Sequence, residues 1–123
     1  MGNRPVLLLV DGHERRRDIR EALEAAAYVV HESFDYFGAI HMFNLYQPAL
    51  VVIDFKFDGK FGLFTALWLS VNTEEPFPTH YVMLTPCDEI EKPGMIRTAR
   101  SQGVQMIPRE SGYVEKILEL AQA

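Results

Sequence analysis

The chain has 123 residues, of which 48% are apolar and 24% are charged, and its formal net charge at pH 7 is −5. These values predict one globular domain over residues 1–123 and exclude the broad basic surface that binds nucleic acid through its phosphates. The single cysteine, Cys87, cannot form an intrachain disulfide, and the apolar run at 5–10 is too short to span a bilayer. We therefore expect a cytoplasmic protein that makes no direct contact with nucleic acid or membrane.

Apolar runs of strand length alternate along the chain with segments that have the periodicity of an amphipathic helix. In chain order they predict a strand at 5–10, a helix at 14–27, a strand at 28–33, a helix at 35–46, a strand at 49–54, a helix at 61–72, a strand at 80–85, a helix at 91–102, a strand at 104–108 and a helix at 112–123. This alternation predicts an α/β fold in which a doubly wound, five-stranded parallel sheet is covered by helices on both faces.

Polar residues stand at the ends of three of the predicted strands. Asp11 follows the first strand, Asp54 ends the third and Thr85 ends the fourth. In a doubly wound parallel sheet, ligands bind beyond the carboxyl ends of the strands, so these three side chains are expected at one edge. That edge is the first candidate for a functional site.

Three stretches resemble the receiver domain of two-component response regulators in their order and spacing. They are LLLVDGHE at 7–14, QPALVVIDFKFDGKFG at 47–62 and YVMLT at 81–85. The resemblance covers nearly the whole chain and implies a flavodoxin-like (βα)5 fold with the strand order 2-1-3-4-5. It also implies a module of phosphorelay signal transduction that is not an enzyme.

The resemblance assigns roles to five positions of this sequence. It implies that Asp54 accepts a phosphoryl group, that Thr85 hydrogen-bonds this group and that Arg109 takes the place of a charge-neutralising lysine. It further implies a Mg²⁺ ion held by the carboxylates of Asp11 and Asp54 and by the backbone carbonyl of Lys56. Positioning and fixed positive charge are the general means by which proteins promote phosphoryl transfer.

The sequence departs from the family pattern at positions that support this chemistry. Gly12 stands where a second carboxylate would ligate the metal, and Mg²⁺ requires oxygen ligands in octahedral geometry, so we expect weak Mg²⁺ binding. Arg109 carries its charge on a wide planar fork instead of a compact ammonium group. Met106 takes the place of an aromatic residue that swings inward when receivers are activated.

We therefore expect a degenerate receiver that acts mainly through protein–protein interaction and whose partner binding does not need phosphorylation of Asp54. The alternative is a functional phosphoacceptor receiver that is switched at Asp54. The expected partner is a histidine kinase, a phosphotransfer protein or an effector domain, and a homodimer is a further alternative. By resemblance, the partner surface comprises the fourth helix, the fifth strand and the last helix, with Ile96, Arg100, Met106, Tyr113 and Lys116 on or near it.

Residues 11–16, DGHERR, resemble the start of a cobalamin-binding signature. They give a third hypothesis, a small-molecule or cobalamin-type cofactor domain on a similar fold. Arg16 replaces the glycine of that signature, so His13 is expected to be a solvated residue at the helix start.

The charge run ERRRDIR at 14–20 is expected to form a solvated helix face, with partner docking as the alternative. Cys87 is expected to be a small loop residue rather than a reactive thiol.

Overall fold

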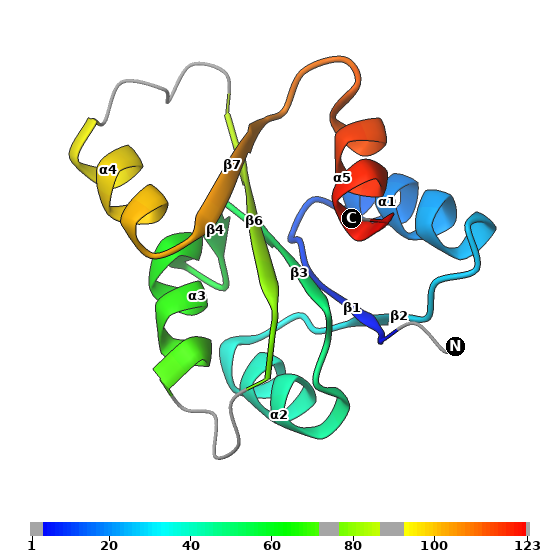
Figure 1. Cartoon of the computed structure of the whole chain (residues 1–123), viewed down its shortest axis with the longest axis horizontal. Coiled ribbons are helices and arrows are strands. Elements are labelled where there is room, and N and C mark those ends of the chain that lie inside the picture. Colours follow the sequence, from blue (N-terminus) through cyan, green and yellow to red (C-terminus); the bar gives the residue numbers. More distant parts are fainter. Residues whose placement is uncertain (1–3, 72–76, 87–92, 123) are drawn as a thin grey trace.

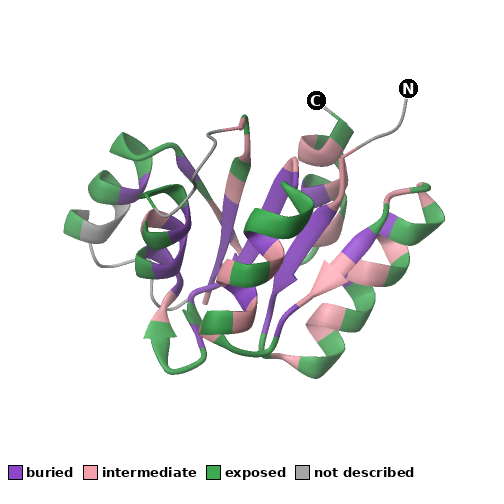
Figure 2. Cartoon of the chain, turned by 90° about the horizontal axis from the view of Figure 1, so that it is seen from below, coloured by how far each residue is buried: buried purple, intermediate pink, exposed green. Residues whose placement is uncertain are grey.

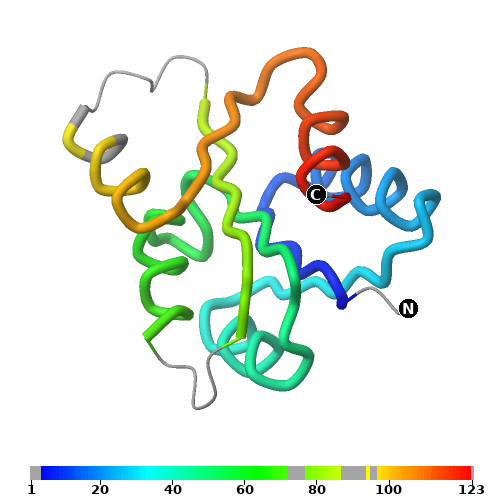
Figure 3. Tube along the Cα trace, in the orientation of Figure 1, coloured from blue at the N-terminus to red at the C-terminus, as the bar shows by residue number. Residues whose placement is uncertain are grey.

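A five-stranded parallel sheet lies between two layers of helices in the computed structural model, which describes residues 4–71, 77–86 and 93–122 (Figure 1). Its elements are β1 (Val6–Leu9), α1 (His13–Ala25), β2 (Val30–Glu32), α2 (Tyr36–Tyr46), β3 (Leu50–Asp54), β4 (Lys56–Phe57), β5 (Lys60–Phe61), α3 (Gly62–Val71), β6 (His80–Thr85), α4 (Pro93–Ser101), β7 (Val104–Pro108) and α5 (Tyr113–Gln122). The trace in Figure 3 shows the alternation of strand and helix that the sequence predicts.

The strands of the large sheet are ordered β2-β1-β3-β6-β7, and each neighbouring pair is parallel. Because β6 and β7 are the fourth and fifth strands of this sheet, the order is the predicted 2-1-3-4-5. The prediction of a doubly wound α/β fold is therefore confirmed. The register places Leu9 beside Ile53 and Asp54 beside Leu84, so the carboxyl ends of the central strands meet at one edge.

The central strands are buried on both faces, which Figure 2 shows as purple strands between helices of mixed exposure. On one face, Leu7 and Leu9 of β1 pack in a cluster with residues of α2, α3 and α4. On the other face, Val6 and Leu8 pack with residues of α1 and α5. Successive side chains of a strand alternate between its faces, so the continuous apolar run of β1 reflects a strand that has no solvated face.

Sequence periodicity does not predict the two-stranded hairpin that follows β3. In this hairpin β4 and β5 pair antiparallel, with Lys56 beside Phe61. Asp58 and Gly59 form the turn, and their φ angles are 50° and 75°. Positive φ at both central residues is what a two-residue type I′ turn requires, and Asp-Gly is a preferred pair for it. A strand of two residues is too short to show the alternation of apolar and polar residues from which strands are predicted.

The predicted helix at 61–72 begins one residue later, at Gly62, close against the end of β3. A Cβ atom at Gly62 would lie 2.1 Å from the backbone oxygen of Asp54 and 2.9 Å from Cγ2 of Ile53. The N–H of Gly62 donates to the carbonyl of Phe55 at 2.7 Å. The absence of a side chain therefore lets α3 start directly beside the strand that carries Asp54.

Helix ends follow from local residue types. The side chain of Asp35 caps α2 by accepting the N–H of Gly38. Gln47 ends this helix in the left-handed conformation, and Gly103, with a φ of 75°, follows α4. Across the described part of the chain, no helix combines the length and the apolar character that crossing a membrane requires.

Replacing Gly62 by alanine is expected to lower the free energy of unfolding by about 1–3 kcal/mol, because the added methyl group cannot fit beside the backbone of Asp54. Urea unfolding followed by circular dichroism measures the change. Gly94→Ala is the matched control, since a Cβ at that helical position would meet nothing within 4 Å. The control should be neutral or slightly stabilising. A Gly62→Ala variant as stable as the wild type would show that α3 can shift away from β3.

Candidate functional site

The structure brings the polar residues of the predicted site to one edge of the sheet. Asp54 is the last residue of β3 and is 1% exposed, and Thr85, which ends β6, is 2% exposed. Asp11 lies just beyond β1, and its N–H donates to Oδ2 of Asp54 at 2.8 Å. Arg109 follows β7, and its N–H donates to the carbonyl of Thr85 at 2.8 Å. These four residues thus lie at the carboxyl ends of four neighbouring strands, where doubly wound sheets bind ligands.

One carboxylate oxygen of Asp54 accepts three hydrogen bonds. Two come from backbone N–H groups, that of Asp11 at 2.8 Å and that of Gly12 at 3.4 Å. The third comes from Nη2 of Arg15 at 3.0 Å, which makes the contact an ion pair. The other oxygen, Oδ1, is buried, and no described residue donates a hydrogen bond to it. Three donors therefore converge on Oδ2.

The ion pair depends on the missing side chain at Gly12. A Cβ atom there would lie 2.4 Å from Cζ and 2.4 Å from Nη2 of Arg15, so the guanidinium occupies that space. Arg15 was not among the predicted site residues, and the prediction of a solvated face at 14–20 is wrong for it, because its side chain is 30% exposed and reaches a buried carboxylate. The sequence signal is an arginine in the first turn after the glycine, since helical side chains point back toward the N-terminus.

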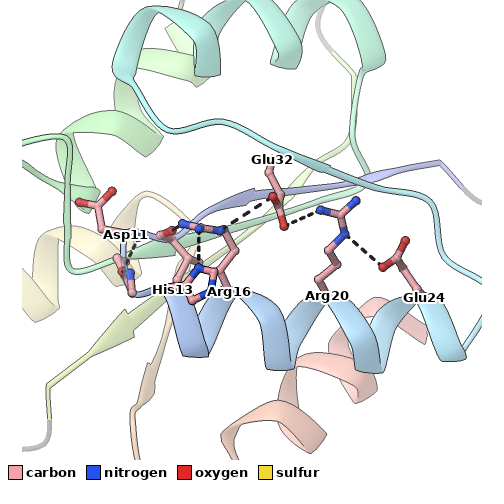
Figure 4. A network of polar contacts seen from close by, with 9 residues as sticks. Asp11, His13, Arg16, Arg20, Glu24 and Glu32 are labelled. Carbon is pink, nitrogen blue, oxygen red and sulfur yellow. Dashed lines mark hydrogen bonds and ion pairs between the residues drawn. The ribbon is translucent and has the colours of Figure 1, made fainter.

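Two further arginines of the same run fasten α1 to β2 (Figure 4). Glu32, the last residue of β2, lies 3.0 Å from Nη1 of Arg20 and 3.9 Å from Nε of Arg16. Arg20 also donates to Glu24, one turn further along α1, at 3.1 Å. These contacts also contradict a fully solvated face. They fix the position of the helix that carries Arg15.

Asp11 uses its carboxylate to hold the hairpin. Its Oδ2 accepts the N–H of Asp58 at 3.1 Å, and Oδ2 of Asp58 accepts the N–H of Tyr36, the first residue of α2, at 2.8 Å. Lys56, whose carbonyl the receiver resemblance assigns to a metal, lies in this hairpin with Nζ 5.6 Å from the centre of the Phe61 ring. The carboxylate of Asp11 therefore positions the loop after β3 and, through Asp58, the start of α2.

This arrangement does not fit the Mg²⁺ site that the receiver resemblance implies. Mg²⁺ requires octahedral oxygen ligation, usually with one or two carboxylates. Position 12 offers no side chain, the carboxylate of Asp11 bonds the hairpin, and a guanidinium stands against Asp54. Within the described ranges, no three or more His, Cys, Asp or Glu side chains form a group that could hold a metal ion.

The surface predicted to bind a partner contains a groove between β7 and α5. The groove has a volume of about 410 Å³ and is lined by Gln105, Met106, Ile107, Pro108, Lys116, Glu119 and Leu120. Two of the predicted interface residues, Met106 and Lys116, therefore line it, and a third, Arg100, is exposed on α4. His13, which was expected to be solvated, is exposed at the start of α1. The side chain of Ile96, and Cys87 as a whole, lie outside the described residues.

Tyr113, also predicted on the partner surface, packs against the core cluster that α1 and α5 share with the sheet. Burial raises the pKa of its phenol, and the negative charge of Asp18 raises it further. Arg15 and Arg109 lower this pKa, whereas Asp54 raises it. The phenol of Tyr113 is therefore close enough to the candidate site to sense its charges.

No family profile and no curated protein sequence matches the chain. Solved structures do match. CheY4, a chemotaxis response regulator of Vibrio cholerae, has a TM-score of 0.78 at 16% identity, over 97% of this chain and 98% of that chain. The response regulator domain of Thermotoga maritima CheB has a TM-score of 0.74 at 18% identity, over 98% of this chain and 94% of that chain.

NtrX from Brucella abortus has a TM-score of 0.75 at 21% identity, over 98% of this chain and 26% of that chain. The chain therefore spans about a quarter of the length of NtrX. At these identities the similarity establishes the fold. The chain has the fold of response-regulator receiver domains.

Replacing Arg15 by alanine is expected to lower the free energy of unfolding by about 1–3 kcal/mol, because the buried carboxylate of Asp54 loses its charged partner. The same replacement in an Asp54→Asn background should cost much less, since no negative charge then needs the guanidinium. Urea unfolding of the wild type, the two single variants and the double variant yields the coupling free energy. Arg17→Ala, at an exposed position of the same helix, is the matched control and should not couple to Asp54→Asn. A coupling near zero for Arg15 would contradict the ion pair.

The pKa of Tyr113 should report the charges of the site. Arg15→Gln removes a positive charge that lowers this pKa, so the pKa is expected to rise above that of the wild type. Asp54→Asn removes a negative charge that raises it, so the pKa should fall. Titration followed by NMR of ¹³C-labelled tyrosine measures both shifts over the alkaline range in which the protein stays folded. Arg100→Gln on α4 is the control and should leave the pKa unchanged. A Tyr113 pKa that stays at the wild-type value in both site variants would place the phenol away from the site.

Proposed function

We propose that the chain is a cytoplasmic receiver module of two-component signalling in which Asp54 is not the switch and which acts mainly through protein–protein interaction. The observation that carries this proposal is the hydrogen bonding of the Asp54 carboxylate. Its Oδ2 already accepts two backbone N–H groups and the guanidinium of Arg15. A module of this kind has no turnover of its own.

The chemistry of phosphoryl acceptance supports the proposal. Transfer requires a carboxylate oxygen that is available to the phosphorus and a divalent cation that neutralises charge on the transferred oxygens. Here Arg15 supplies a single positive charge and uses Oδ2 of Asp54 as its acceptor. Thr85 and Arg109 remain at the adjoining strand ends, but the groups around Asp54 favour the unmodified carboxylate. We therefore expect phosphoryl acceptance to be slow.

We expect a receiver that is not switched at Asp54 to present one dominant conformation to its partner. Moving a two-state equilibrium from mostly one state to mostly the other takes about 5.5 kcal/mol of differential binding. Met106 offers no aromatic ring for the usual inward movement, and its side chain already packs partly against the core cluster of α2, α3 and α4. We therefore propose that the partner binds this one conformation constitutively.

The proposed partner is a histidine kinase, a phosphotransfer protein or an effector domain that contacts α4, β7 and α5. The groove between β7 and α5 supports this surface, because it combines apolar walls at Met106 and Leu120 with opposite charges at Lys116 and Glu119. Such a mixture suits a protein partner with an apolar anchor and a polar rim. A second copy of the chain could occupy the same groove as a homodimer.

The test of this proposal is phosphoryl acceptance by the unmodified protein. The chain is incubated with acetyl phosphate and Mg²⁺, and its intact mass is measured with time. We expect the wild type to remain unmodified to the same extent as Asp54→Asn, because Oδ2 of Asp54 is held by Arg15 and two backbone N–H groups and Oδ1 is buried. A beryllofluoride titration followed by amide NMR should leave the signals of β7 and α5 in place. Near-complete modification that Asp54→Asn abolishes would instead establish the phosphoacceptor alternative.

A further inference from the structure

We propose that Gly12 and Arg15 form a matched pair that provides the candidate site with its own tethered cation. In this pair the guanidinium of Arg15 takes the space that a ligating side chain at position 12 and a divalent cation would otherwise share. The inference rests on the proposed function in one respect, because it assumes that the edge around Asp54 is a receiver site. It goes further by naming the group that replaces the metal and the residue that makes room for it.

The first support is steric. A Cβ atom at Gly12 would lie 2.4 Å from Cζ, 2.4 Å from Nη2 and 2.7 Å from Nη1 of Arg15. Three atoms of one guanidinium thus lie within a forbidden distance of a single added carbon. Any residue other than glycine at position 12 would push the guanidinium away from its present place. The side chain of Arg15 is flexible, so the expected result is displacement of the cation rather than unfolding.

The second support is electrostatic. Asp54 is 1% exposed, and a buried carboxylate is costly unless it is hydrogen-bonded and paired with a positive charge. Arg15 provides the charge at 3.0 Å, and the backbone N–H groups of Asp11 and Gly12 provide the remaining hydrogen bonds. These two N–H groups also lie at the positive end of the α1 dipole. The carboxylate therefore has its counter-charge without a metal ion.

The third support is that α1 is held in the position that the pair needs. Arg16 and Arg20, one turn apart on α1, both contact Glu32 at the end of β2. Arg16 also donates from Nη1 to the carbonyl of Val10, immediately before the turn that contains Gly12. The helix start therefore has little freedom, and Arg15 projects from it over Gly12 toward Asp54.

A specific consequence follows for attempts to rebuild a metal site. An aspartate introduced at position 12 would add a carboxylate beside a guanidinium that remains in the pocket. Arg15 would then pair with the new carboxylate as well as with Asp54, and the cation site would stay filled. Both positions must change before a divalent cation can enter, so their effects on metal binding should be strongly non-additive.

The experiment compares Mg²⁺ binding by the full chain in the wild type, Gly12→Asp, Arg15→Gln and the double variant. Isothermal titration calorimetry gives the affinity, and Mn²⁺-induced broadening of the amide signals near Asp54 locates the ion. Arg15→Gln keeps a polar side chain but removes the positive charge and shortens the reach toward Asp54, and Arg15→Ala serves as a second version in case either variant is too unstable. Gly12→Asp combined with Arg17→Ala is the matched control, because Arg17 lies on the same helix and is exposed.

We expect the double variant to bind Mg²⁺ about tenfold more tightly than Gly12→Asp alone, with the ion located at Asp54. The wild type, Arg15→Gln and the Arg17 control should show no comparable gain. Equal affinity of Gly12→Asp and the double variant would overturn the proposal, because it would show that Arg15 does not hold the cation position. So would wild-type binding as tight as that of the double variant.

These outcomes are separate from those of the phosphoryl-acceptance test. If the wild type is phosphorylated equally well in the presence of a chelator of divalent ions, the proposed function fails while the tethered cation stands. If the wild type resists phosphorylation but binds Mg²⁺ at Asp54 as tightly as the double variant, the proposed function stands and the tethered cation fails.

Discussion

The burial of one carboxylate at the end of a central strand is the constraint on which the rest of this site depends. Asp54 is enclosed by the ends of β1 and β6 and by the start of α3, where water cannot compensate its charge. The protein therefore has to provide hydrogen-bond donors and a positive charge from its own groups. The turn after β1 supplies two backbone donors, and α1 supplies the guanidinium of Arg15.

Two glycines allow the backbone and the cation to approach this carboxylate. Gly62 brings the first turn of α3 against the carbonyl of Asp54, and Gly12 leaves the space that the guanidinium fills. Neither position needs an unusual φ angle, since neither glycine lies in the left-handed region. A larger residue does not fit at either position, because the backbone of Asp54 or the guanidinium of Arg15 already occupies the space that its Cβ atom would need. The steric requirement therefore comes from the surroundings of Asp54 and not from local turn geometry.

Several charged residues at this edge form contacts that hold neighbouring elements in place. The carboxylate of Asp11 holds the hairpin after β3, and Arg16 and Arg20 hold α1 on β2 through Glu32. Polar groups near Asp54 thus stabilise the elements around it. Under the proposed function, these contacts keep the interaction module folded without phosphorylation of Asp54.

Much of the site could be located from the sequence because strand ends are readable. The apolar run before Asp54 stops at a polar residue, and so does the run before Thr85, so both could be assigned to one edge of a parallel sheet. The hairpin at Lys56 escaped prediction because strands of two residues carry no periodicity. Tyr113 was expected on the partner surface, but its packing against the α1 and α5 cluster depends on how two distant helices meet.

The sequence by itself determined where the buried strands lie along the chain and the edge at which Asp11, Asp54 and Thr85 gather, because strands buried on both faces must be continuously apolar. The order of the strands in the sheet was predicted from the resemblance to receiver domains. The sequence could not determine which cation reaches Asp54. Several arginines lie in the first turns of α1, and the sequence does not distinguish the one that faces Asp54 from its neighbours. Only the tertiary structure decided that Arg15 turns inward while its neighbour Arg16 turns to Glu32, because that choice depends on where α1 sits over the ends of β1 and β3.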